Sequence, residues 1–163
     1  MIVVSNTSPV LNLACVGEQT ILQKLFGSVQ APPAVQAEVE GLRRDQPRFA
    51  KVELPSFVPI TAVRNGSLVA ALALELDGGE AEAIALAVEL RADLLLVDEH
   101  RGRRVAQRMG LKPLGLLGVL TMAKQRGVNT EIKPLWARLE SAAGFWVGSS
   151  LRRQILAEAG EAP

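Results

Sequence analysis

Two short runs of consecutive apolar residues constrain the fold of this chain more than any other feature. Ile2-Val3-Val4 stands near the amino terminus, and Leu94-Leu95-Leu96-Val97 lies past the middle of the sequence. A strand that is apolar at every position, rather than at every second one, is buried on both faces of its sheet. Such strands belong to parallel sheets that carry helices on both sides. The two runs therefore predict an α/β protein with a central parallel sheet.

Helical patterns separate the apolar runs, as a layered α/β arrangement requires. The clearest lies at residues 80–90, where Ala81, Ile84, Ala85 and Val88 form one apolar stripe. We expect further helices at residues 8–16, 18–26, 33–43, 101–109, 114–125, 131–142 and 151–159, the first of them starting at Ser8 before Pro9. We expect further strands near Val29, at residues 57–63 and, as an edge strand, at residues 145–147. Residues 67–76 are either a short helix or an apolar loop.

The length and composition of the chain suit one domain of ordinary size. It has 163 residues, of which 48% are apolar, so we expect a single domain over residues 1–163 with residues 160–163 frayed. The single cysteine, Cys15, excludes an internal disulfide and a Cys/His zinc site, which favours a reducing, cytoplasmic compartment. We expect no secretory leader and no membrane association, because no apolar run is long enough to span a bilayer.

Three acidic residues and one amide are expected to meet at one edge of the sheet. Asn6 follows the first apolar run, Asp98 follows the second, and Glu80 begins the helix between them. That helix and the strand after it are each about 16 Å long and run in opposite directions, so Glu80 and Asp98 stand at the same level. Glu38 lies about one and a half turns into the helix after the second strand, near the same edge. Glu40 is an alternative occupant of that position.

Carboxylates gathered in this way point to a hard divalent cation. They repel one another unless a cation neutralises them, and oxygen ligands without His or Cys select Mg²⁺ or Mn²⁺. Such an ion activates water and stabilises the charge on a phosphoryl group. Each residue also has a structural interpretation, since Glu80 suits the first turn of a helix, Glu38 suits a solvated helix face and Asp98 suits a helix cap. The only histidine, His100, is more simply a loop residue than a catalytic base.

Several segments, in this order, resemble the PIN-domain family. They are IVVSNTSPV at the start, PPAVQAEV near residue 35, LDGGEAEAIALAVEL from Leu76, ADLLLVDEHRGRRVA from Ala92 and GLLGVL from Gly115. The chain is most similar to the branch named DUF3368, which is related to the VapC toxins, and the similarity extends to about Leu156. The resemblance implies a PIN-like three-layer α/β fold, with a central, mostly parallel sheet flanked by helices.

The same resemblance implies a function and a set of site residues. PIN domains are Mg²⁺- or Mn²⁺-dependent nucleases, and many are ribonuclease toxins that a small antitoxin protein neutralises. The second, third and fourth acids of the family, which are its catalytic and metal-binding residues, fall on Glu38, Glu80 and Asp98. Ser8 matches a hydroxyl-bearing position, and the first acid falls on Asn6. An amide oxygen can ligate a metal but adds no charge and cannot act as a general base, so metal affinity and catalysis should be weakened.

A basic helix face lies beside the expected acidic pocket. Arg101, Arg104 and Arg108 follow Asp98 at the spacing i, i+3, i+7, and Arg103 is expected to add to the same face. Such a face suits the phosphate backbone of RNA, although a merely solvated face is the alternative. Aromatic residues make up only 4% of the chain, so recognition by base stacking is poorly supported. The net charge of +1 neither demands nor excludes a nucleic-acid partner.

Three functional hypotheses remain open on the sequence. The first is a metal-dependent ribonuclease that forms the toxin-like component of a toxin–antitoxin pair. The second is a PIN scaffold that binds RNA or a protein partner without cleavage, which Asn6 favours. The third is an unrelated α/β binding module, which the lack of a G-x-G-x-x-G or P-loop pattern disfavours. Homodimerisation is common in similar proteins, and the apolar helices of this chain would permit it.

Overall fold

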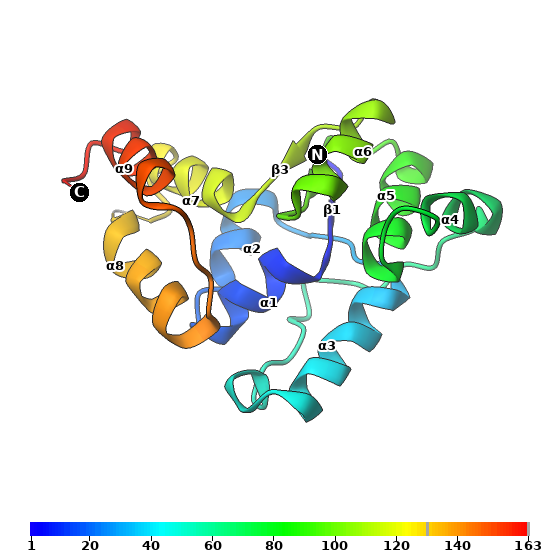
Figure 1. Ribbon diagram of the computed structural model, residues 1–163, viewed down its shortest axis with the longest axis horizontal. Helices are drawn as coiled ribbons and strands as arrows, with labels where there is room; N and C mark the ends of the chain where they lie inside the picture. The colour runs from blue at the N-terminus through cyan, green and yellow to red at the C-terminus, as the bar shows by residue number, and fades with distance from the viewer. Residues whose placement is uncertain (130, 163) are drawn as a thin grey trace.

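A short parallel sheet lies at the centre of the computed structural model, which describes residues 1–129 and 131–162 (Figure 1). Its strands, in the order β1-β2-β3, are β1 (Val3–Ser5), β2 (Leu94–Leu96) and β3 (Pro113–Leu114). Both pairings are parallel. The predicted α/β architecture with a parallel sheet between helices is therefore confirmed.

Isolated parallel bridges continue the sheet beyond β1. They pair Val4 with Gln30 and Ala31 with Ile60. At the positions of the strands expected near Val29 and at residues 57–63, the structure thus has only single β-bridges. The sequence does not predict β3, because its pattern places residue 114 in a helix. Two residues are too few to show any periodicity in the sequence, and the tertiary pairing with β2 alone defines this strand.

Helices cover the sheet and make up most of the chain. They are α1 (Thr7–Cys15), α2 (Thr20–Phe26), α3 (Pro33–Asp45), α4 (Gly66–Leu72), α5 (Gly78–Leu90), α6 (His100–Arg108), α7 (Leu116–Gln125), α8 (Ile132–Arg138) and α9 (Ser149–Glu158), with a 3₁₀ turn at Pro47–Phe49 and a π-helical turn at Leu139–Ala143. α4 settles the open choice at residues 67–76 in favour of a helix. Within the described residues, none of these helices combines the length and apolarity needed to cross a membrane.

Successive side chains of β1 and β2 enter two different apolar clusters. Val3 and Leu96 pack into the larger cluster, which includes residues of α1, α2, α7 and α8. Val4, Leu95 and Val97 pack into the other, formed largely by α5 and α6. Figure 1 shows α4, α5 and α6 on one side of the sheet and α1, α2, α7, α8 and α9 on the other. Burial on both faces is the reason that the two strands are apolar at every position.

The expected edge strand at residues 145–147 is wrong. These residues are irregular, and Trp146 exposes 71% of its surface. The N–H group of Phe145 donates to the carbonyl of Leu139 at 3.0 Å and so closes the end of the preceding helical turn. Gly144, with φ of 70°, turns the chain at that point. A backbone N–H group that is already hydrogen-bonded within a helix end needs no partner in a neighbouring strand.

Residues 160–162, which are expected to fray, include one residue with several contacts, while Pro163 lies outside the described residues. The Glu161 carboxylate accepts hydrogen bonds from Lys124 Nζ at 2.7 Å and from the N–H groups of Ile132 at 2.8 Å and Lys133 at 3.0 Å. The last two donors belong to the first turn of α8, whose N–H groups lack helical partners. Glu161 therefore caps α8 from a distance in sequence.

Candidate functional site

The polar residues that follow β1 and β2 lie at the same edge of the sheet. Asn6 comes directly after β1, and its N–H group donates to the carbonyl of Leu96 in β2 at 2.9 Å. Asp98 lies two residues beyond the end of β2. Parallel strands bring their carboxyl ends together, and this edge is where α/β proteins place their sites.

Asn6 occupies the N-cap position of α1, two residues before the expected start at Ser8. An N-cap side chain normally accepts a hydrogen bond from the second or third helical N–H group. The third helical residue here is Pro9, which has no N–H, and Asn6 makes no capping hydrogen bond. Its side-chain oxygen, Oδ1, is buried and has no hydrogen-bond partner among the described residues. Pro9 thus helps to leave that oxygen available to a ligand.

Gly79, in the first turn of α5, lets three side-chain oxygens approach one point. A Cβ atom on Gly79 would stand 2.5 Å from Glu38 Oε2, 3.2 Å from Asn6 Oδ1 and 3.5 Å from Asp77 Oδ1. The three side chains come from α3, from the cap of α1 and from the cap of α5. The structure therefore brings Glu38 and Asn6 together and adds Asp77. We call this group of three oxygens around Gly79 the oxygen cradle.

Sequence reasoning did not single out Asp77, although a signal was present. The pattern Asp-Gly-Gly-Glu places an acidic N-cap three residues before Glu80. The Oδ1 atom of Asp77 accepts a hydrogen bond from the Glu80 N–H group at 2.8 Å. The capping pattern thus predicts the position of Asp77 at the start of α5, whereas its proximity to Asn6 and Glu38 follows only from the tertiary structure.

A threonine hydroxyl orients the Glu38 carboxylate. Thr7 Oγ1 donates to Glu38 Oε2 at 2.7 Å, a contact that sequence reasoning did not predict. Of the two candidate acids on α3, it is Glu38 that faces the oxygen cradle. Glu40 lines a separate hollow of about 390 Å³ next to basic residues of the same helix.

Glu80 is buried between α5 and α6. It exposes only 6% of its surface, and its Oε2 atom has no hydrogen-bond partner among the described residues. Gly102 of α6 makes room for this carboxyl group, because a Cβ there would overlap Oε2. Burial first, then a hydrogen bond with Asp77 and the negative charges of Asp77 and Glu99, raise the pKa of Glu80 to about 7. A nearby cation would stabilise its ionised form.

The Asp98 side chain is bound to the start of α7. Its Oδ1 atom accepts a hydrogen bond from the N–H group of Leu116, the first residue of α7, at 2.6 Å. Burial raises the pKa of Asp98, whereas the Leu116 N–H group and the Arg103 guanidinium lower it. No described contact joins Asp98 to Glu38 or Glu80. Asp98 thus caps α7, not the helix that follows it directly, and Arg103 faces Asp98 instead of adding to the basic face.

The expected ligands carry amide and carboxylate oxygens, which are the atoms that a hard divalent cation prefers. Three of these oxygens are buried with no hydrogen-bond partner among the described residues: Asn6 Oδ1, Glu80 Oε2 and Asp98 Oδ2. Buried polar atoms are rarely left unpaired, and a cation is a partner that oxygen atoms of this kind accept. In the part of the chain that the structure describes, however, no three His, Cys, Asp or Glu side chains are arranged so that they could hold a metal ion. Binding therefore requires at least one carboxylate to turn, and Glu38 and Asp77 are exposed.

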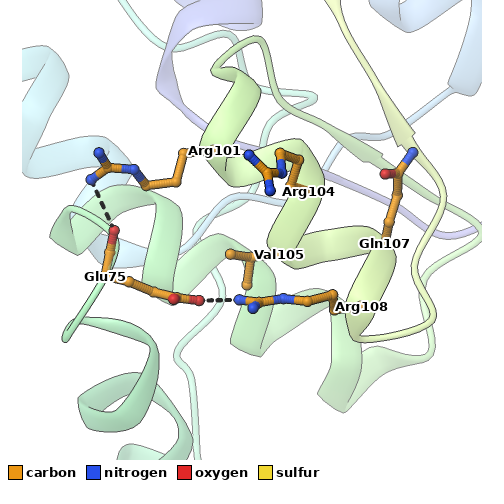
Figure 2. A pocket seen from close by; sticks show the side chains of 6 residues that line it. All are labelled: Glu75, Arg101, Arg104, Val105, Gln107 and Arg108. Carbon is orange, nitrogen blue, oxygen red and sulfur yellow. Dashed lines mark hydrogen bonds and ion pairs between the residues drawn. The ribbon is translucent and has the colours of Figure 1, made fainter.

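The outer face of α6 lines a basic hollow of about 610 Å³, which we call the arginine groove (Figure 2). Figure 2 shows Arg101 and Arg108 directed at Glu75, which lies between α4 and α5. Arg101 Nη1 donates to the Glu75 carbonyl at 3.2 Å, and Arg108 forms an ion pair with the Glu75 carboxylate. Arg104 lies between them and makes no hydrogen bond or ion pair with any described residue. The groove therefore holds one cationic side chain with no internal partner.

Comparison with known families identifies the family of this chain. The model of the DUF3368 family, described as a PIN domain, matches residues 2–161. The chain belongs to the PIN domain family. The resemblance noted from the sequence is confirmed, and comparisons with curated proteins and with solved structures gave no match. PIN domains are generally nucleases that typically depend on a divalent metal and act on RNA.

Proposed function

We propose that this PIN domain is an Mg²⁺- or Mn²⁺-dependent ribonuclease with its site at the oxygen cradle. The observation that carries the proposal is the placement of Glu38 Oε2 next to the buried, unpartnered Asn6 Oδ1 around Gly79. In this proposal the ion is held by Asn6, Glu38 and Glu80, with Asp98 completing the set after its side chain turns from α7. These four residues are also the catalytic residues of the proposal.

The residues of the chain prepare the site in distinct ways. Thr7 orients Glu38 through its hydroxyl, and the absence of side chains at Gly79 and Gly102 leaves space for the oxygens. Glu38 is exposed, whereas Asn6 is buried, so a phosphodiester can approach Glu38 from solvent. A divalent cation bound there would activate water and stabilise the negative charge on the phosphoryl group. The Asn6 amide cannot accept a proton from that water, which limits the expected rate.

Cleavage of RNA by the purified protein tests this proposal. With Mn²⁺ present we expect cleavage that EDTA abolishes, and Glu38→Gln should reduce the rate at least about 100-fold, because loss of a metal-ligand charge weakens both ion binding and catalysis. Glutamine still accepts the Thr7 hydrogen bond, so the fold should be retained. Glu40→Gln removes a carboxylate from the same helix outside the cradle and should leave the rate unchanged. Equal rates for the two variants would overturn the proposal.

We further propose that the RNA backbone lies in the arginine groove. Three arginines line it, and an intramolecular anion, the carboxylate of Glu75, pairs with Arg108. A phosphate group would make the same kind of contact with a guanidinium group, and more strongly. The groove adjoins the cradle along the chain, since Glu75 precedes Asp77 by two residues. Glu75 therefore competes with RNA for the arginines.

Two substitutions in the groove should change RNA affinity in opposite directions. Glu75→Gln should tighten RNA binding about 3-fold because it removes the competing charge, and Arg104→Ala should weaken it by about 3- to 10-fold and lower the salt slope by about one. Fluorescence anisotropy with labelled RNA in EDTA measures both affinities. Arg126→Ala removes an exposed arginine at the end of α7 and serves as the control. If all three variants bind RNA equally, the groove is not the binding surface.

The proposal includes a toxin-like role with a small antitoxin protein as partner, which the relation of the DUF3368 branch to the VapC toxins favours. The alternative function is a PIN scaffold that binds RNA or a protein without cleaving RNA. Two observations favour that alternative, namely the neutral side chain of Asn6 and the use of Asp98 as a cap of α7. The cleavage assay separates the two functions. A wild-type protein that binds RNA but is as inactive as Glu38→Gln supports the scaffold.

A further inference from the structure

We propose that Asp77 is a metal ligand that supplies, from the start of α5, the negative charge that Asn6 lacks. This inference rests on the proposed function, because it concerns the same ion. Sequence reasoning assigned no role to Asp77, and its position at the N-terminus of a helix would by itself suggest only a cap. The structure adds two observations, namely what lies beside the capping oxygen and a buried oxygen without a partner.

The first is that Asp77 faces the same point as Asn6 and Glu38. Its Oδ1 atom lies 3.5 Å from the position of a Cβ on Gly79, and Asn6 Oδ1 lies 3.2 Å from it. Asp77 also lies close enough to the Glu80 side chain to share a hydrogen bond with it. Asp77 is also exposed, so its carboxylate has room to turn.

The second is the buried amide oxygen at the base of the cradle. Asn6 exposes only 5% of its surface, and its Oδ1 atom has no hydrogen-bond partner among the described residues. Pro9 offers it no N–H group to cap. A buried oxygen without a hydrogen-bond partner indicates that a ligand binds it. Because carboxylates surround this oxygen, a cation is the ligand that matches the site. This observation is independent of the acidic residues themselves.

Charge explains why Asp77 is needed. Asn6 contributes no charge, and Asp98 can contribute its charge only after its side chain turns from the Leu116 N–H group and from Arg103. The two negative charges of Glu38 and Glu80 alone would only equal the two positive charges of a divalent cation. A third carboxylate from Asp77 would strengthen the attraction, because affinity for hard cations rises with the number of charged ligands.

Calorimetric titration with MnCl₂ tests the role of Asp77 without relying on activity. Asp77→Asn and Asp77→Ser both keep an N-cap residue and so preserve α5, yet each should weaken Mn²⁺ binding at least about 10-fold. Glu82→Gln removes a carboxylate from the same helix and should bind Mn²⁺ like the wild type. The double variant Asn6→Asp, Asp77→Asn should regain most of the lost affinity, because the charge returns to the cradle.

Each outcome of the titration has a distinct meaning. If Asp77→Asn and Asp77→Ser bind Mn²⁺ as tightly as the wild type while Glu38→Gln does not, Asp77 is only a cap and the proposed metal site stands. If the wild type itself binds no Mn²⁺, the metal site and the role of Asp77 both fail. A loss of affinity in Asp77→Asn that Asn6→Asp does not restore contradicts the inference that Asp77 acts through its charge.

Discussion

Replacing Asn6 by aspartate should raise the rate of Mn²⁺-dependent RNA cleavage about 10- to 100-fold at limiting metal, because the change adds a charged ligand to the site. Asparagine and aspartate have almost the same shape, so the oxygen cradle around Gly79 should persist. The Asn6 Oδ1 atom is already buried and unpartnered, 3.2 Å from where a Cβ on Gly79 would stand. The added carboxylate would also provide the general base that the amide cannot provide.

The same substitution should destabilise the protein when metal is removed. A carboxylate at position 6 would be buried next to Glu38 and Asp77, and burial with like charges disfavours the ionised form. We expect the melting temperature of Asn6→Asp to fall in EDTA and to recover on addition of Mn²⁺, because an ion that binds only the folded state stabilises it. Asn12→Asp introduces a charge at another buried position of α1 and should be destabilised without recovery. Asn6→Asp that shows neither recovery nor a rate increase would mean that no ion binds at the cradle.

Gly79→Ala should abolish metal-dependent cleavage, with a loss of about 100-fold or more, while leaving the stability of the protein nearly unchanged. A methyl group there would stand 2.5 Å from Glu38 Oε2 and so must displace that carboxylate. The displaced atom is the far end of an exposed side chain, so the backbone need not move. Alanine favours a helix over glycine by about 0.5–1 kcal/mol, which offsets the loss of the hydrogen bond from Thr7, worth about 1 kcal/mol.

Gly78→Ala is the matched control for this prediction. It makes the same change one residue earlier in the same helix turn, where a Cβ would meet no atom within 4 Å. We expect full cleavage activity and a small gain in the free energy of unfolding, measured by urea denaturation. Equal activity of Gly79→Ala and Gly78→Ala would show that the space around Gly79 has no role in the reaction.

The sequence predicted the framework because the framework is encoded in local patterns. The uniformly apolar runs that became β1 and β2 reveal burial on both faces, and the stripe of α5 reveals a helix between them. Parallel strands then place Asn6 and Asp98 at one edge by topology alone. The position of Glu38 follows from the same reasoning, although only the structure distinguishes it from Glu40.

The sequence could not predict features that depend on contacts between distant segments. Asp98 looks like a metal ligand or a cap of the next helix, but its partner is Leu116, 18 residues away. In the sequence, Asp77 is only a helix cap, and its proximity to Glu38 of α3 and to Asn6 after β1 arises from the tertiary packing. Glu161 caps α8 only because the chain returns to it. In each case a polar group finds its partner through the tertiary fold, which spacing along the chain does not encode.

The position of a bound ion tests the central claim most directly. Crystals grown or soaked with MnCl₂ and measured at a wavelength where manganese scatters anomalously would locate it. We predict an anomalous peak next to Gly79, at coordination distance from Asn6 Oδ1 and from carboxylate oxygens of Glu38 and Glu80, with Asp77 as a further ligand. An empty cradle at saturating Mn²⁺, or a peak only at another place on the surface, would contradict the account.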